Sequence, residues 1–205
     1  LLLDGIASPV EETRPWNPML GTHSQYPFDN FLLAIYPPVE VASRIYGVAD
    51  GVRRERGLTR RLRPAHILHI TLCLLRDELC MDAAASVAKG VRCAPFEVSF
   101  DRISTFAGNA QRQERHDALP CALSCLKNDN LALRYLHRQL HAPLRRLGIS
   151  VRPVFAPHVT VLYDPTNVPV QMIEAIRWQV DRFALVHSHY GKTNHEVIES
   201  WSLTG

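Results

Sequence analysis

The sequence lacks the patterns that mark membrane, secreted and zinc-stabilised proteins. No apolar run approaches the roughly 20 residues of a membrane-spanning helix, and residues 1–3 are too short and lack the basic flank of a secretory signal. The five cysteines, at positions 73, 80, 93, 121 and 125, are odd in number and irregularly spaced, so they fit neither a disulfide framework nor a zinc site. We therefore expect reduced thiols in a cytoplasmic protein with no membrane partner.

Two common kinds of catalytic motif are also missing. The chain has no glycine-rich phosphate-binding loop and no cluster of carboxylates. Its net charge of +3 permits an anionic ligand without requiring one. A length of 205 residues suffices for one domain, or for two small lobes that share a core.

What the sequence does contain is a short motif that occurs twice. His69-Ile70-Thr71-Leu72 and His158-Val159-Thr160-Val161 each lie in an apolar, β-branched run, at residues 67–75 and 154–163, which predicts a strand. Side chains alternate faces along a strand, so His and Thr two residues apart point the same way. The apolar residue that follows each of them then points into a core.

The repetition predicts two related halves of one domain. With ten His and nine Thr in the chain, chance gives roughly 0.1 matches to a His-x-Thr motif whose two polar residues are each followed by an apolar one. One copy alone would fit a histidine with a purely structural role in a strand. Two copies 89 residues apart, each preceded by a strand and a helix, indicate lobes related by a pseudo-twofold axis, with the His and Thr side chains converging on a central cleft.

The rest of the pattern predicts an α+β fold with antiparallel sheet and outer helices. Residues 1–27 are proline-rich and without periodicity, and are expected to form an extended arm before a single bilobal domain at 28–205. Strands are predicted around residues 31–35, 96–100, 119–126 and 176–185, with a last strand at 197–203 that pairs with its predecessor. Helices are predicted at 41–52, at 81–93 and from residue 130 to a stop at Gly148.

Two imidazoles and two hydroxyls around one cleft suit in-line displacement at phosphorus. Histidine titrates near neutral pH, so one can act as a base while the other acts as an acid. Two hydroxyls can donate hydrogen bonds to phosphate oxygens on which charge accumulates. Neither His69 nor His158 has a third His, Cys or carboxylate at a useful spacing, so no metal is expected.

At this point the sequence resembles a known family. The segments PAHILHITLCLL and VFAPHVTVLYD resemble the two signature motifs of the 2H phosphoesterases. The tail FALVHSHYGKTNHEVIESWSL is similar to the closing hairpin of their bacterial branch, the RNA 2′,3′-cyclic phosphodiesterases, also called 2′-5′ RNA ligases. The resemblance covers residues 28–203 and implies a two-lobed α+β fold with a central cleft.

The resemblance also implies an activity and its residues. His69, Thr71, His158 and Thr160 fall on the catalytic positions of a cofactor-free hydrolase that opens 2′,3′-cyclic phosphates to 2′-phosphates. The expected partners are RNA ends or small nucleotides with a cyclic phosphate, and we expect a monomer. The alternatives are a 2′-5′ RNA ligase, a hydrolase of another cyclic or linear phosphodiester, and a non-catalytic protein that binds RNA ends.

One position departs from the family pattern. Members near the bacterial branch often have an arginine five residues after the second histidine, and Tyr163 stands there in this chain. Arg152, Arg76 or Lys192 could supply the missing cation, and Tyr163 could stack on a base. A run of arginines at positions 53, 54, 56, 60, 61 and 63 leads into the first His strand. It fits either phosphate binding or a solvated helix end.

Overall fold

The computed structural model describes residues 30–75, 78–106, 118–126, 129–189 and 192–205. The predicted N-terminal arm, residues 1–27, lies outside the described residues. Among the helices that are described, none is both long enough and apolar enough to cross a membrane.

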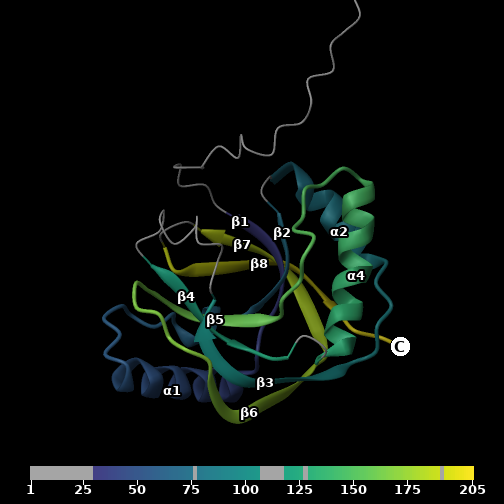
Figure 1. The fold of residues 1–205 in the computed structure, drawn as a ribbon. Helices are drawn as coiled ribbons and strands as arrows, with labels where there is room; N and C mark the ends of the chain where they lie inside the picture. Colours follow the sequence, from purple (N-terminus) through teal and green to yellow (C-terminus); the bar gives the residue numbers. More distant parts are fainter. Residues whose placement is uncertain (1–29, 76–77, 107–117, 127–128, 190–191) are drawn as a thin grey trace, which may run out of the picture.

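The strands and helices follow the predicted order (Figure 1), except that the strand predicted at 176–185 is divided at Asp181 into two strands that are not neighbours in the sheet. The strands are β1 (Asn30–Ile35), β2 (Ile70–Leu75), β3 (Phe96–Thr105), β4 (Leu119–Ser124), β5 (His158–Asp164), β6 (Gln171–Val180), β7 (Arg182–His189) and β8 (Asn194–Ser202). The helices are α1 (Val39–Glu55), α2 (Met81–Lys89) and α4 (Leu131–Arg146). Gly57 and Gly148 adopt positive φ angles of 64° and 79° after α1 and α4, and the second of these confirms the predicted helix stop at Gly148.

All eight strands belong to one antiparallel sheet in the order β6-β3-β4-β5-β2-β1-β7-β8. The order divides into two halves of four strands, each of which contains one His-Thr strand. The halves meet where β5 lies beside β2, and there a single residue pair, Ile70 with Val159, is in register. This arrangement confirms the predicted α+β fold with two related lobes.

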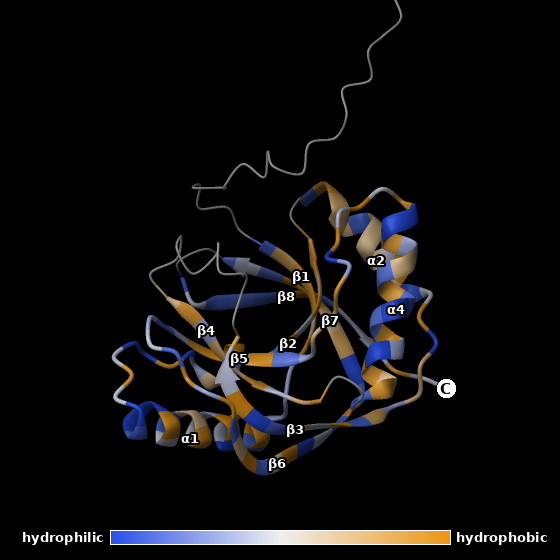
Figure 2. Ribbon diagram, viewed as in Figure 1, coloured by the Kyte–Doolittle hydropathy of each residue, from blue (hydrophilic) through white to orange (hydrophobic). Residues whose placement is uncertain are grey.

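The helices lie on the outside of the curved sheet (Figure 1). Helix α1 packs against β5 and β6, whereas α2 and α4 pack against each other, α2 against β7 and β8, and α4 against β2 and β3. Hydrophobic and hydrophilic residues alternate along these elements (Figure 2). In α4 the buried stripe consists of Leu133, Leu136, Leu140 and Leu144, whose spacing of three or four residues keeps them on one helix face.

Two predicted strands begin later than the apolar runs indicated. Pro64 precedes a 3-10 turn at Ala65–Ile67, so β2 begins only at Ile70. Strand β5 begins at His158, directly after Pro157, because proline lacks the N–H that a paired strand residue donates. His66 therefore lies exposed on the turn.

Candidate active site

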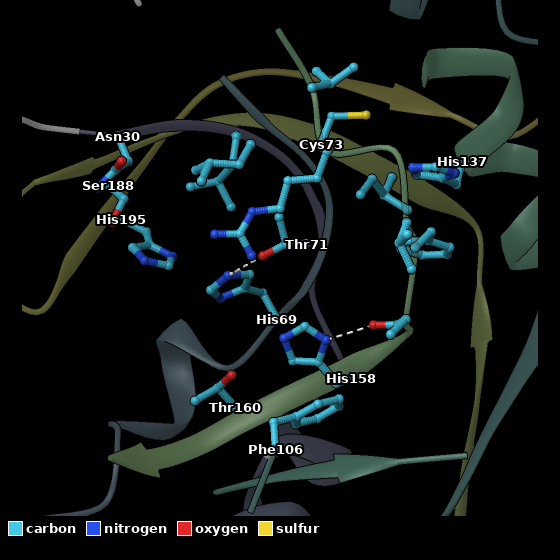
Figure 3. Close-up of a pocket in the computed structure, with 18 of the residues that line it drawn as sticks. Asn30, His69, Thr71, Cys73, Phe106, His137, His158, Thr160, Ser188 and His195 are labelled. Carbon is cyan, nitrogen blue, oxygen red and sulfur yellow. Dashed lines mark hydrogen bonds between the residues drawn. The ribbon is translucent and has the colours of Figure 1, made fainter. Parts of the chain in front are cut away.

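The two motifs meet at the boundary between the halves of the sheet. Ile70 is paired with Val159, and both side chains are fully buried. The two strands run in opposite directions at this pair, so His69 and Thr71 flank it on one strand and His158 and Thr160 flank it on the other. Alternation places all four on the face opposite the core, where they line a cleft of about 490 Å³ (Figure 3).

Each motif strand carries a β-bulge just after its threonine. Thr71 pairs with Ala34 on β1, and the register then shifts so that Leu72 is passed over. Thr160 pairs with Ala122 on β4, and Val161 is passed over in the same way. A bulge bends its strand and redirects the neighbouring side chains. The two halves therefore share the local irregularity that shapes the cleft, as well as the motif.

Both histidine rings are oriented by a carbonyl two residues earlier. Nδ1 of His69 is 2.8 Å from the carbonyl oxygen of Ile67, and Nδ1 of His158 is 2.7 Å from that of Ala156. A carbonyl can only accept, so each Nδ1 carries its proton. Nε2 is then the nitrogen that can exchange protons in the cleft. In His69 it lies 3.1 Å from Thr71 Oγ1, and the neutral ring accepts a hydrogen bond from that hydroxyl.

Both histidines are neutral at pH 7 before substrate binds. Burial lowers the pKa of His69 from 6.5 to about 4, against the opposing hydrogen bond to Ile67, and the neighbouring His195 and Arg63 lower it further. Burial also lowers the pKa of His158, and Arg152 contributes to that shift. An unliganded site therefore presents two unprotonated Nε2 atoms.

Each histidine has its own arginine in the cleft lining. Arg63 and Arg152 stand six residues before His69 and His158, and a proline follows each of them. The backbone N–H of Arg63 donates to the carbonyl of Val161, the residue in the β5 bulge, at 2.7 Å. The buried Nε of Arg63 has no hydrogen-bond partner, which is costly unless a ligand accepts from it.

Sequence reasoning missed Arg63 as an individual site residue. It counted only as one member of the arginine run, three of whose six members lie at the solvated end of α1, where Arg53 and Arg54 pair with Asp50. The signal that could have found it is that the Arg-Pro dipeptide is repeated at the same distance from both histidines.

A third histidine, His195, also lines the cleft and was not predicted. Its ring lies 4.9 Å from that of His69, and its Nδ1 is 2.8 Å from the hydroxyl of Tyr36. Burial lowers the pKa of His195 to about 4 and raises that of Tyr36. No local sequence pattern marks His195, because it reaches the cleft only when β7 and β8 line up beside β1.

Aromatic and apolar side chains line the part of the cleft beside His158. The Phe106 ring lies 4.8 Å from the His158 ring, and Phe155 stacks on His137 with ring centroids 4.2 Å apart. Tyr163, which is 47% exposed, belongs to the same lining. One part of the cleft is thus charged and polar, and the other offers flat apolar surfaces.

The four residues named as substrate contacts fall in different places. Arg152 and Tyr163 line the cleft. Lys192 is exposed in the turn before β8 and is not among the lining residues. Arg76 lies outside the part of the chain that the structure describes.

Comparison with known proteins shows the family to which this chain belongs. The family model for the 2′-5′ RNA ligase superfamily matches residues 37–192. A search of curated proteins found no match. Escherichia coli LigT complexed with 3′-AMP is similar in structure, with a TM-score of 0.68 and 20% identity over 86% of this chain and 99% of LigT. TT0787 of Thermus thermophilus has a TM-score of 0.67 and 23% identity over 86% and 98% of the two chains.

A crystal structure described as a phosphoesterase is also similar to this chain, with a TM-score of 0.67 and 20% identity over 87% of this chain and all of that one. At such identities the structural likeness establishes the fold, and the family model, which spans most of the chain, establishes the relationship. The chain belongs to the 2′-5′ RNA ligase superfamily, the 2H phosphoesterases.

Proposed function

We propose that this protein is a metal-independent phosphodiesterase that hydrolyses 2′,3′-cyclic phosphates on RNA ends or small nucleotides to 2′-phosphates. The observation that carries the proposal is the pairing of Ile70 with Val159, which brings both His-Thr pairs to one face at the cleft. Membership of a superfamily of phosphoesterases and RNA ligases supports this class of reaction.

In the proposed reaction a water molecule attacks phosphorus while the bond from phosphorus to the 3′ oxygen breaks. Nε2 of His158 accepts the proton from the attacking water. Nε2 of His69, in its protonated form, donates a proton to the departing 3′ oxygen. The products are a 2′-phosphomonoester and a free 3′ hydroxyl, and the Nδ1 hydrogen bonds to Ile67 and Ala156 hold both rings throughout.

Arg63 and Arg152 are proposed to bind the phosphate from two sides. A guanidinium forms charge-assisted hydrogen bonds with phosphate oxygens, and the unpartnered Nε of Arg63 is a donor already in place. The hydroxyls of Thr71 and Thr160 donate further hydrogen bonds as charge builds up on the non-bridging oxygens. These two arginines would supply the positive charge that the family places at the position of Tyr163.

The apolar part of the cleft is proposed to hold the base of the nucleotide. Phe106, Phe155 and Tyr163 offer aromatic rings in the lining on which a base can stack. Structures of E. coli LigT with 3′-AMP and with ATP show that a protein of this fold binds nucleotides, which supports a nucleotide substrate here.

A panel of substrates tests the proposal. It comprises 2′,3′-cyclic nucleotides of each base, ADP-ribose cyclic phosphate and oligonucleotides ending in a cyclic phosphate, with the 2′- and 3′-phosphate products resolved by chromatography. We expect turnover to the 2′-phosphate alone. Binding of these compounds without turnover would instead indicate a protein that only recognises RNA ends, and joining of oligonucleotide ends would indicate a ligase.

Turnover is expected to survive metal chelation. Within the described ranges, no three His, Cys, Asp or Glu side chains that line the cleft have the spacing of a metal site. Incubation with EDTA followed by desalting should therefore change kcat less than about twofold, as expected when the proton transfers use imidazoles. Loss of turnover that Zn²⁺ or Mn²⁺ restores would contradict the proposal.

The pH optimum of kcat/KM is expected to lie below 6.5. This parameter reports the free enzyme, in which burial lowers the pKa of His69 to about 4 and that of His158 below its usual value. The acid form of His69 therefore becomes scarce as the pH rises. A bound phosphate anion stabilises the imidazolium and raises both pKa values, so the optimum of kcat should lie at higher pH. Rates measured from pH 4 to 9 would show this, and coincident optima would contradict it.

A further inference from the structure

A second group of histidines lies on the β7–β8 hairpin, on the face away from the cleft. His187 and His189 are two residues apart on β7, so their side chains share one face. Glu196 on β8 is paired directly with His187. The neighbouring pair, Ser188 with His195, lines the cleft, which places the His-His-Glu group behind it.

The potential ligand atoms of this group are close together. Nε2 of His189 is 3.2 Å from Oε2 of Glu196, and Nδ1 of His187 is 4.0 Å from the same oxygen. The three ligand atoms all lie within 4.8 Å of one another. A tetrahedral zinc ion with bonds of about 2.1 Å needs ligand atoms about 3.4 Å apart. A small rotation of the exposed Glu196 side chain would bring its carboxylate to that spacing.

The two imidazoles are already held in place. The ring of His187 stacks on Phe31, which belongs to the core, with centroids 4.6 Å apart. The two histidine rings lie 3.9 Å apart, and their side chains are only 22% and 20% exposed. Among the residues that the structure describes, no lysine or arginine forms an ion pair with Glu196. A carboxylate held next to two imidazoles gives the donor set that zinc binds.

We propose that Nδ1 of His187, Nε2 of His189 and the Glu196 carboxylate bind one Zn²⁺ ion, with water as the fourth ligand. The ion bridges β7 and β8 next to the cleft residues Ser188 and His195. Its role is structural: it ties the hairpin that presents His195 and takes no part in the proton transfers. The site does not depend on the proposed hydrolysis, and it is compatible with turnover that survives EDTA.

The test uses the full chain after treatment with chelator and desalting. Zn²⁺ is titrated by calorimetry, and Co²⁺ binding is followed by visible absorption, because tetrahedral cobalt absorbs more strongly than octahedral cobalt. The wild type is compared with His189→Ala and Glu196→Gln. His66→Ala, which removes an exposed histidine elsewhere, and His158→Ala, which alters the cleft, are the controls. Circular dichroism confirms that each variant is folded.

We expect one Zn²⁺ per chain and a tetrahedral cobalt spectrum in the wild type and both controls. At an ion concentration about 100-fold above the dissociation constant, the melting temperature should rise by about 5 °C or more. His189→Ala and Glu196→Gln should each weaken binding at least about 10-fold, because the first removes a ligand and the second replaces the carboxylate with a neutral amide, which binds zinc more weakly. Failure of the wild type to bind Zn²⁺, undiminished binding by these two variants, or loss of binding in His158→Ala would overturn the proposal.

Discussion

Replacing either His69 or His158 with alanine is expected to lower kcat at least about 100-fold on a 2′,3′-cyclic nucleotide. Each Nε2 faces the cleft and each ring is fixed by its Nδ1 hydrogen bond, so no neighbouring group can easily take over the proton transfer. The nearest substitute is His195, whose ring lies 4.9 Å from that of His69. Its Nδ1 is 2.8 Å from the hydroxyl of Tyr36, a contact that holds the His195 ring in its own position.

The threonines provide a graded comparison. Thr71→Ala and Thr160→Ala each remove one hydroxyl that donates to phosphate, and should lower kcat by about 10-fold, less than the loss of a proton-transfer group. The exposed His66 is the matched control, because it lies three residues before His69 outside the cleft lining, and His66→Ala should leave kcat unchanged. Losses of equal size in all the cleft variants would mean that the histidines only shape the site.

The second large effect is expected from Arg63. Arg63→Gln should lower kcat/KM on the same substrate by about 10- to 100-fold. A loss of this size corresponds to the free energy of one charge-assisted hydrogen bond to phosphate. Arg63 is also one of the groups that lower the pKa of His69, so removing its charge should raise that pKa. The kcat/KM profile of the variant should therefore extend to higher pH than that of the wild type.

Another arginine of the same arginine run provides the control for Arg63→Gln. Arg61 is exposed and is not among the residues that line the cleft. Arg61→Gln makes the same change of charge two residues away, and should affect neither kcat/KM nor its pH profile. If Arg61→Gln and Arg63→Gln behave alike, the arginines act only through the overall charge of the surface and not through a bond to phosphate.

The sequence was sufficient to predict the parts of the site that strand periodicity controls. His69 and Thr71 share a face because strand side chains alternate, and the repeat of this pattern at His158 required a second strand of the same kind. The burial of Ile70 and Val159 confirms the predicted orientation of both strands. Their direct pairing could not be predicted, because the register of strands 89 residues apart depends on how the two halves pack.

The parts that were missed depend on tertiary structure. Arg63 reaches the cleft because a bulge at Val161 leaves a carbonyl to accept its N–H, and neither bulge has a clear sequence signal. His195 reaches it because β8 is the edge strand next to β7, with a register that places His195 opposite Ser188.

The central claim is that one histidine in the cleft acts as a base and the other as an acid. A substrate with an unusually good leaving group at the 3′ position tests this claim most directly. Such a group departs with little need for a proton, so the acid becomes dispensable while the base does not. The measurement is kcat for the wild type, His69→Ala and His158→Ala on this substrate and on the ordinary cyclic nucleotide. We predict that His69→Ala recovers most of its lost rate on the activated substrate and that His158→Ala stays inactive. Recovery by His158→Ala alone would reverse the two roles, and equal loss on both substrates by both variants would contradict the division into acid and base.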